Sequence, residues 1–510
     1  MTAQIHTDRV VIVGAGLGAL YAALSFAPYP VLVISPEALG AGASSTWAQG
    51  GVAAAMAKTD SPEAHANDTI AAGAGAVDPV IAALVTAEAR QHVLALTELG
   101  TPFDRDAQGN YLLNHEAAHS EARVVRARGD QSGAKIMERL VAAVENTPSV
   151  QVLEGFVVTG LIKTNSQVRG VEIIPVAGGA AACRIIAPAV LLAAGGVGGL
   201  YAKTTNPPQI RGEALGLAIR AGAKVRDLEF VQFHPTAIDI GLDPCPLATE
   251  ALRGEGGLLL NNEGVRFALA HDPRGELAPR DVVARAIFSE ERAGRRPVLD
   301  VREAVGQAMA ERFPTVTCAC LRGGVDPSRE PIPVTVAAHF HMGGVATDEN
   351  GRTSLEGLWA CGEVACTGLH GANRLASNGL LEALVFAQRA AADIRQGLCG
   401  NPDLTMAIVP QASAGSGAKI DLGSVALVRR TMSRDVGVVR RAKGLRYAIT
   451  VIGELLAAHA DDIRFINMCT AALAIAEAAL ARPDPCGSHF RDDLSKLVDG
   501  AKHEQLKEPL

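Results

Sequence analysis

Arg9-Val-Val-Ile-Val13 and the residues directly after it, Gly14-Ala-Gly16-Leu-Gly18-Ala19, decide the fold. The apolar run predicts a buried strand, the glycines predict a tight turn, and the Ala- and Leu-rich stretch that follows predicts a helix. A second apolar run, Val31-Leu-Val-Ile34, completes a βαβ unit. In such a unit, backbone N–H groups at the start of the helix bind a pyrophosphate. The pattern predicts a dinucleotide site with these contact residues: Gly14, Ala15, Gly16, Leu17, Gly18, Ala19 and, ending the second strand, Ser35.

The residue at position 35 bears on how the ribose is bound. An acidic residue often binds the ribose there. Serine weakens that contact or leaves it to Glu37 or to the backbone. The glycine motif itself does not distinguish FAD from NAD.

Two further apolar runs end in glycines, at 189–196 and at 357–363. Together with the first run they predict one nucleotide-binding domain whose sequence is interrupted by an insertion. Residues 227–338 lose the periodicity and collect His, Arg, Thr and Glu, which favours a capping domain. The predicted fold is α/β: a Rossmann-like domain (1–226 and 339–400) interrupted by an α+β capping domain (227–338), then a linker at 402–417 and a C-terminal helical domain (418–510). Within the last domain, residues 425–446 and 458–481 have helical spacing.

Composition excludes several classes of protein. The 47 Lys and Arg against 54 Asp and Glu give a net charge of -7, which does not favour nucleic acid or an anionic membrane as partner. We find no apolar run of the roughly 18 residues that span a bilayer and no signal-like N-terminus, so the predicted location is cytoplasmic. Nine cysteines, an odd number without a C-x-x-C pair, indicate reduced thiols. No metal site is predicted.

Small and polar residues ending in paired glycines occupy Ser44-Ser-Thr-Trp-Ala-Gln-Gly-Gly51, where backbone can lie against a flat ring system. Here the chain resembles the L-aspartate oxidase family, within the succinate dehydrogenase and fumarate reductase flavoproteins, from Val10 to about Arg446. The resemblance implies FAD, and Ser45 stands near the place of the His that bonds covalently to flavin in respiratory relatives, so we expect noncovalent FAD. The implied FAD contacts are Ser45, Thr46, Trp47, Ala48, Gln49, Gly50, Gly51, Val157, Glu213, Glu363, Gly379 and Leu380. Glu213 replaces the usual Asp, and Gly379 replaces an expected Ser.

A dicarboxylate substrate needs cationic or hydrogen-bond-donating groups at both ends. By resemblance to the family, the candidate groups are Gln232, His234, Thr249, Glu250, Arg280, His339 and Arg374. His234 and Thr249 are expected to donate to one carboxylate, and His339 and Arg374 are further anion ligands. Arg280 resembles the family's proton donor or acceptor. Because a guanidinium normally stays protonated, we expect it mainly to polarise and orient the substrate while a carboxylate or water carries protons.

Choice between succinate and aspartate depends on a group that accepts a hydrogen bond from the amine. Glu116 falls where aspartate oxidases resemble one another in carrying an acidic residue; the alternative is a glutamate of a surface loop. Ala117 and Ala118 stand where the family usually has Gly. His119 either lines the cleft or is a structural histidine.

The resemblance implies hydride transfer from C2 of L-aspartate to flavin N5, giving iminoaspartate. The reduced FAD is then reoxidised by oxygen or fumarate. In the family iminoaspartate goes to quinolinate synthase, at the first step of de novo NAD synthesis. One alternative is a soluble fumarate reductase or succinate dehydrogenase flavoprotein. Another is a noncatalytic flavin or dicarboxylate sensor, which the presence of Arg280 disfavours.

Overall fold

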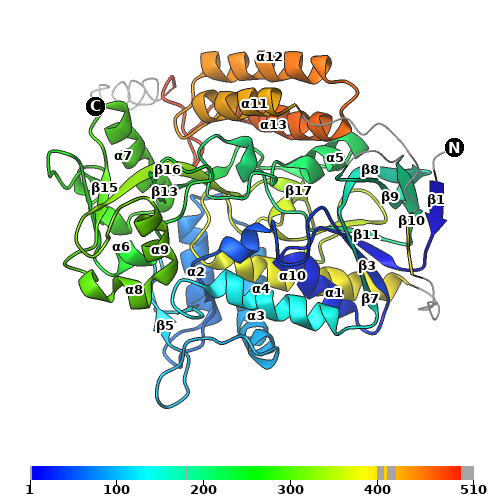
Figure 1. Ribbon diagram of the computed structural model, residues 1–510, viewed down its shortest axis with the longest axis horizontal. Coiled ribbons are helices and arrows are strands. Elements are labelled where there is room, and N and C mark those ends of the chain that lie inside the picture. The colour runs from blue at the N-terminus through cyan, green and yellow to red at the C-terminus, as the bar shows by residue number, and fades with distance from the viewer. Residues whose placement is uncertain (1–2, 178–181, 399–406, 411–420, 495–510) are drawn as a thin grey trace, which may run out of the picture.

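A five-stranded parallel sheet forms the centre of the computed structural model, which describes residues 3–177, 182–398, 407–410 and 421–494 (Figure 1). The linker predicted at 402–417 lies outside these residues except for 407–410. The strands, in spatial order, are β18 (Leu358–Ala360), β11 (Val190–Leu192), β2 (Val10–Val13), β3 (Val31–Ser35) and β7 (Val150–Glu154). The three runs that precede glycines are thus the neighbours β2, β11 and β18, which confirms the interrupted α/β fold.

Both faces of this sheet are buried, and alternate residues of β2 belong to two different cores. Val10 and Ile12 belong to the core that includes the helical layer. Val11 and Val13 belong to the core that continues into the C-terminal helices. A strand buried on both faces has no polar alternation, which explains its unbroken apolar sequence. The helical layer consists of α1 (Leu17–Phe26), α3 (Pro79–Glu98), α4 (Ser132–Glu145) and α10 (Asn378–Gly397).

A second sheet lies beside the parallel one, at the right of Figure 1. Its strands, in spatial order, are β1 (Ala3–His6), β10 (Cys183–Ile186), β9 (Gln167–Pro175) and β8 (Phe156–Thr164). Strand β8 also contacts helix α5 (Glu213–Ala221).

A four-stranded antiparallel sheet stands at the other side of the molecule (Figure 1). Its strands, in spatial order, are β13 (Val231–Ile238), β16 (Ile332–His341), β15 (Val298–Asp300) and β14 (Leu258–Leu260). Helix α7 (Arg280–Arg292) packs on β13 and β16, and so brings its first residue toward the centre. The same part of the chain holds α6 (Ala251–Gly254), α8 (Met309–Arg312) and α9 (Pro314–Arg322).

Short strands tie the loops around the centre together. One small sheet consists of β4 (Val52–Ala53), β6 (Val124–Val125) and β5 (Leu113–Asn114). The other consists of β12 (Val225–Arg226), β17 (Gly344–Ala346) and β19 (Ala365–Cys366). Helix α2 (Pro62–Ala72) packs against α3.

Three helices cover the top of the view in Figure 1: α11 (Leu422–Asp435), α12 (Ala442–Ala458) and α13 (Ile463–Ala481). The continuous helix expected over 425–446 is wrong, because the chain leaves the helix between Asp435 and Ala442. There Arg440 is buried and donates to the backbone oxygens of Gly437 and Glu229, contacts that no local pattern encodes. Helix α13 also begins later than expected, where Asp462 caps it.

Helix α13 also contradicts the expectation that no apolar run is long enough to span a bilayer. It is long and apolar enough, by length and composition, to cross a membrane. Half of its most apolar stretch is buried, and it packs against α12 and α5. We therefore interpret it as a core helix of the C-terminal bundle.

Candidate active site

One cavity collects residues from every layer of the fold. The turn after β2, the segment 41–51 and the first residues of α10 line it. Side chains of β13, β16 and α7 line it as well, and α13 contributes Arg464. Segments far apart in the sequence therefore meet around one space.

The turn between β2 and α1 fits a bound anion. Gly14 has φ +113°, and a Cβ there would lie 2.4 Å from the Ala193 carbonyl oxygen, so only glycine permits this turn. Gly16 is the N-cap of α1 and offers no side chain to its N–H groups. The first N–H groups of a helix lack partners within the helix, so those of α1 other than the Leu17 N–H, which Ser45 Oγ accepts, remain to bind a phosphate.

The segment 44–51 is fixed on several sides. Ser45 Oγ accepts from the Leu17 N–H at 3.2 Å, which joins the segment to α1. The Ala48 carbonyl accepts from the Gly133 N–H at 2.9 Å, at the start of α4. A Cβ on Gly51 would lie 2.0 Å from the Val125 carbonyl oxygen. The wall of the cavity here is therefore backbone at close approach, with little room for side chains.

Two positions where the chain departs from the expected family residue have a local explanation. Glu213 forms two contacts of 3.0 Å with Arg464 of α13. At Gly379, a Cβ would lie 3.0 Å from the Phe340 ring and 3.3 Å from Arg374 Nη1. Glycine at 379 therefore leaves space for the stacked pair of Arg374 and Phe340.

Glu363 is half-buried on the cavity wall, and its carboxyl has a raised pKa. It accepts a hydrogen bond from the His341 N–H at 3.0 Å. Burial raises its pKa to about 7, so the carboxyl is partly protonated near neutrality.

Two histidines stand side by side in the cavity. The rings of His234 and His339 are 4.9 Å apart between centroids. Burial, followed by the charge of Arg280, holds the pKa of both well below its usual value, so both are neutral. The Thr236 N–H donates to His234 Nδ1 at 3.2 Å, which leaves the ring proton on Nε2 as a donor. His339 Nδ1 is bonded to Thr205 Oγ1 at 2.8 Å. Buried Thr249 lines the same cavity.

Arg280 is held from two directions at the start of α7. Its Nε is paired with Glu250, and its Nη1 donates to Gln232 Oε1 at 2.9 Å. Burial pushes the pKa of Glu250 up, but the charges of Arg280 and Arg253 outweigh it, so the pKa is lowered and Glu250 is ionised. Gln232 Nε2 also donates to the Arg374 carbonyl at 2.9 Å. Gln232 does not line the cavity itself. It orients Arg280 and Arg374, which do.

Arg374 is buried without an acidic partner. Within the described part of the chain, its guanidinium makes no recorded hydrogen bond or ion pair, and its Nε is buried and unpartnered. The guanidinium lies over the Phe340 ring instead, with 4.4 Å from Cζ to the ring centroid. Burial, followed by the Arg280 charge, lowers its pKa to about 9. A buried, unpaired cation is costly, so this arrangement suits an incoming anion.

Glu116 is a buried carboxylate and not a surface glutamate. Its Oε2 accepts from Ser377 Oγ at 2.8 Å, while its Oε1 is buried without a partner. Burial raises its pKa, and the nearby Glu250 adds to that effect. The free oxygen of a residue that lines the cavity is available to a donor on the substrate.

Most of the residues predicted from the sequence surround this one cavity. Those lining it are Gly14, Ala15, Gly16, Leu17, Gly18, Ser35, Ser45, Trp47, Ala48, Gln49, Gly50, Gly51, Glu116, Val157, Glu213, His234, Thr249, Glu250, Arg280, His339, Glu363, Arg374, Gly379 and Leu380. Ala19, Thr46 and Gln232 do not line it. Ala19 is buried in the helical core, and Thr46 Oγ1 is directed to the Gly40 carbonyl at 3.5 Å.

Sequence reasoning missed several lining residues, among them Asn206, Arg211 and Arg464. Arg211 has a buried Nε without a partner, and Arg464 reaches the cavity from the C-terminal bundle. Each is a single residue outside any glycine or histidine motif. The charge of the C-terminal helices was the only available signal, and it does not say which arginine points inward.

The lining fits a large polar cofactor together with a small anion. Buried polar atoms without partners lie on residues of the cavity wall: Gln49 Oε1, Glu116 Oε1, Arg211 Nε and Arg374 Nε. The N-terminus of α1, which its N-cap residue Gly16 does not cap with a side chain, and the glycine-lined backbone complete the set, which matches a dinucleotide with a flat ring. In the described residues no group of three or more His, Cys, Asp or Glu could hold a metal ion.

Comparisons with known proteins agree with this geometry. Residues 9–380 match the family model described as FAD binding domain, and residues 459–505 match fumarate reductase flavoprotein C-term. The chain is 52% identical to an L-aspartate oxidase of Caulobacter vibrioides over 96% of its length and 94% of the relative. It is 46% identical to an L-aspartate oxidase of Agrobacterium fabrum, over 98% of this chain and 94% of that protein.

Among solved structures, the chain is similar to a quinol fumarate reductase chain of E. coli, with TM-score 0.86 and 28% identity. That likeness covers 97% of this chain and 92% of the other. An adenylylsulfate reductase of Archaeoglobus fulgidus, at 16% identity and TM-score 0.73, shares the fold.

Proposed function

The chain belongs to the L-aspartate oxidase family of FAD-binding flavoproteins, and from this premise we propose that it oxidises L-aspartate to iminoaspartate with noncovalently bound FAD. One observation carries the assignment to this cavity: it holds both an unpaired buried cation, Arg374, and an unpaired buried carboxylate oxygen, Glu116 Oε1. L-Aspartate has the two complementary groups, a carboxylate and an amine. Succinate has no group for Glu116.

FAD, when bound, supplies the ring that accepts the hydride from C2. The residues of this chain bind and orient the substrate. Arg374 pairs with one carboxylate, the neutral His234 donates to a carboxylate oxygen beside it, and His339 is a further anion ligand. Thr249 adds a hydroxyl on the same wall.

Arg280 polarises the reacting end of the substrate, and its position is fixed by Glu250 and Gln232. The substrate ammonium has to lose a proton before its C2–H leaves as hydride, because the nitrogen lone pair then forms the C=N bond. Glu116 Oε1 is placed to accept a hydrogen bond from that nitrogen. Glu250, ionised and paired with Arg280, is a second carboxylate of the cavity that can take part in proton transfer.

The cofactor is held without a covalent bond in this proposal. The segment 44–51 contains no histidine, and Ser45 Oγ is already bonded to the Leu17 N–H. Acid precipitation should release the flavin into the supernatant, and yellow pellets would contradict this part of the proposal.

Oxygen or fumarate then reoxidises the cofactor, and iminoaspartate passes to quinolinate synthase as the first step of de novo NAD synthesis. A cytoplasmic location goes with this role. Its support is that the cysteines of the described residues are all free thiols, as expected in a reducing compartment.

Anaerobic titration of the purified protein tests the proposal. L-Aspartate should bleach the flavin absorbance, whereas D-aspartate and succinate should not, and fumarate added afterwards should restore it. Bleaching by succinate alone would favour the alternative of a soluble succinate dehydrogenase or fumarate reductase flavoprotein. Bleaching by none of the three would favour a sensor.

A further inference from the structure

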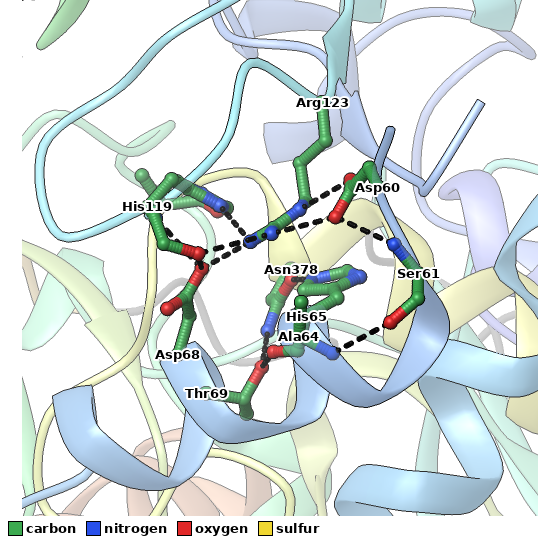
Figure 2. A network of polar contacts seen from close by, with 11 residues as sticks. Asp60, Ser61, Ala64, His65, Asp68, Thr69, His119, Arg123 and Asn378 are labelled. Carbon is green, nitrogen blue, oxygen red and sulfur yellow. Dashed lines mark hydrogen bonds and ion pairs between the residues drawn. The ribbon is translucent and has the colours of Figure 1, made fainter. Parts of the chain in front are cut away.

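A buried polar network links Asp60, Asp68, His119 and Arg123 (Figure 2). Arg123 is at its centre and is fully buried. Its Nε and Nη2 bond to the two oxygens of Asp60 at 2.9 and 3.0 Å, and its Nη1 is paired with Asp68. The network joins α2, the loop at 115–123 and the N-terminus of α10, three segments that meet next to the cavity.

Arg123 determines which nitrogen of His119 carries the ring proton. Its Nη1 donates to His119 Nδ1 at 3.2 Å. A guanidinium has no acceptor, so Nδ1 must accept and the proton stands on Nε2. His119 Nε2 then donates to the Ala376 carbonyl at 3.1 Å. Burial lowers the pKa of His119 to about 4, which keeps the ring neutral and this single tautomer in place.

The residue after Ala376 is held in a costly backbone conformation. Ser377 has φ +63°, in the left-handed region, which costs a residue with a side chain about 1–2 kcal/mol. Its Oγ donates to Glu116 Oε2 at 2.8 Å and accepts from the Gly51 N–H at 3.3 Å. The direction of Ser377 Oγ therefore sets which oxygen of Glu116 stays free.

His119 contacts the backbone both of Glu116 and of the residue before Ser377. Through Nε2 it holds the carbonyl just before Ser377, and through its own N–H it bonds to the Glu116 carbonyl at 3.2 Å. Its neighbour Ala118 is also left-handed, with φ +63°. The next residue of α10, Asn378, is held separately by His65 at 2.8 Å and by Thr69 at 3.0 Å (Figure 2). On the Ser377 side, the His119 ring holds the Ala376 carbonyl, while the Ser377 carbonyl itself accepts from the Ala53 N–H at 3.3 Å.

We propose that His119 is a positioning residue for amine recognition: its ring, which Arg123 holds as the tautomer with the proton on Nε2, fixes the Ala376 carbonyl beside Ser377, and Ser377 turns Glu116 so that Oε1 faces the substrate. This inference rests on the proposed role of Glu116. His119 itself does not line the cavity. His119 affects selectivity for the substrate amine and not the binding of the substrate carboxylates, because neither Arg374 nor His234 is bonded to it.

Two substitutions separate the two contacts of the ring. In His119→Asn the short amide retains an acceptor for Arg123 but cannot reach the Ala376 carbonyl. In His119→Gln the longer amide places an N–H near the former Nε2 and retains that second contact. The readouts are KM and kcat for L-aspartate, Ki for succinate as an amine-free competitor, and the amount of bound FAD.

His119→Asn should raise KM for L-aspartate about tenfold, or about 1.4 kcal/mol, with kcat and the succinate Ki changed less than about twofold. His119→Gln should stay within about threefold of the parent in every parameter. Equal increases of KM and succinate Ki in both variants would overturn the proposal, since they indicate general damage. Parent-like behaviour of His119→Asn would overturn it as well.

Glu116→Gln separates this inference from the proposed function. If Glu116→Gln raises KM while His119→Asn does not, the positioning role fails and the amine contact stands. If Glu116→Gln leaves KM unchanged, the amine contact itself fails. Should His119→Asn not fold, Ser377→Ala decides the matter, because it removes the bond to Glu116 and leaves the Arg123 network intact. An unchanged KM in Ser377→Ala would overturn the proposal.

Discussion

Two buried arginines, Arg123 and Arg374, are treated in opposite ways by this fold. Arg123 is surrounded by Asp60 and Asp68; burial opposes its charge, but the two carboxylates outweigh it and raise its pKa. Arg374 has no recorded acidic partner in the described residues, and burial lowers its pKa to about 9. The charge of Arg123 is balanced within the protein. The charge of Arg374 is left for a ligand to balance, so at Arg374 the protein gives up stability to bind an anion.

The largest expected effect concerns the reacting end of the cavity. Arg280→Leu should lower turnover of L-aspartate by about 10² to 10³ while the protein retains FAD, because it removes the cation that polarises the substrate. Steady-state kinetics and flavin absorbance measure both. Arg274→Leu, which breaks an exposed pair with Asp272, is the matched control and should keep its activity. Undiminished turnover in Arg280→Leu would remove this residue from the mechanism.

Arg123→Met should act on stability. It leaves Asp60 and Asp68 as unpaired carboxylates, and breaking such a buried arrangement costs about 3–5 kcal/mol. Urea unfolding of the FAD-loaded protein measures the change. A decrease of the free energy of unfolding below about 1 kcal/mol, the range of an exposed ion pair, would mean that the Arg123 network does not stabilise the fold.

Arg374→Met should act on binding. Losing a charge-assisted contact to a carboxylate costs about 2–3 kcal/mol, which corresponds to a rise of about 10²-fold in KM for L-aspartate and in Ki for succinate. Both ligands should weaken together, since both carry that carboxylate. A change confined to L-aspartate would assign Arg374 to the amine end instead.

The smallest expected effect is a pH dependence. Because the pKa of Glu116 is raised, its acid form persists to higher pH than usual, and a protonated carboxyl cannot accept from the amine. KM for L-aspartate should therefore rise as the pH falls, by about tenfold per pH unit below that pKa. The succinate Ki should not follow this rise, and Glu116→Gln should abolish it. A parallel rise of both constants would place the titrating group elsewhere.

The parts of this site that could be predicted from sequence are those whose cause is local. The turn at Gly14 needs a positive φ and a close approach, which glycines directly after a strand supply. The residues expected to bind the substrate carboxylates could be identified only through resemblance to a family. Contacts across the chain left no signal: Glu116 and Ser377 are 261 residues apart, and Glu213 and Arg464 are 251 apart.

The C-terminal helices show the same limit. Helical spacing predicted that they exist, but not the interruption before Ala442, which depends on the buried contacts of Arg440 with Glu229 and His489. The spacing also gave no reason to place Arg464 on the cavity wall. Long-range pairs of this kind are determined by the assembled fold.

The central claim is that Arg374 is kept unpaired for a substrate carboxylate. Thermal melting of FAD-loaded parent and Arg374→Met, each with and without succinate under anaerobic conditions, tests it most directly. We expect the variant without ligand to melt at or above the parent, because an unpaired buried charge has been removed, and we expect succinate to stabilise only the parent. A variant that melts lower than the parent and is still stabilised by succinate would contradict the claim.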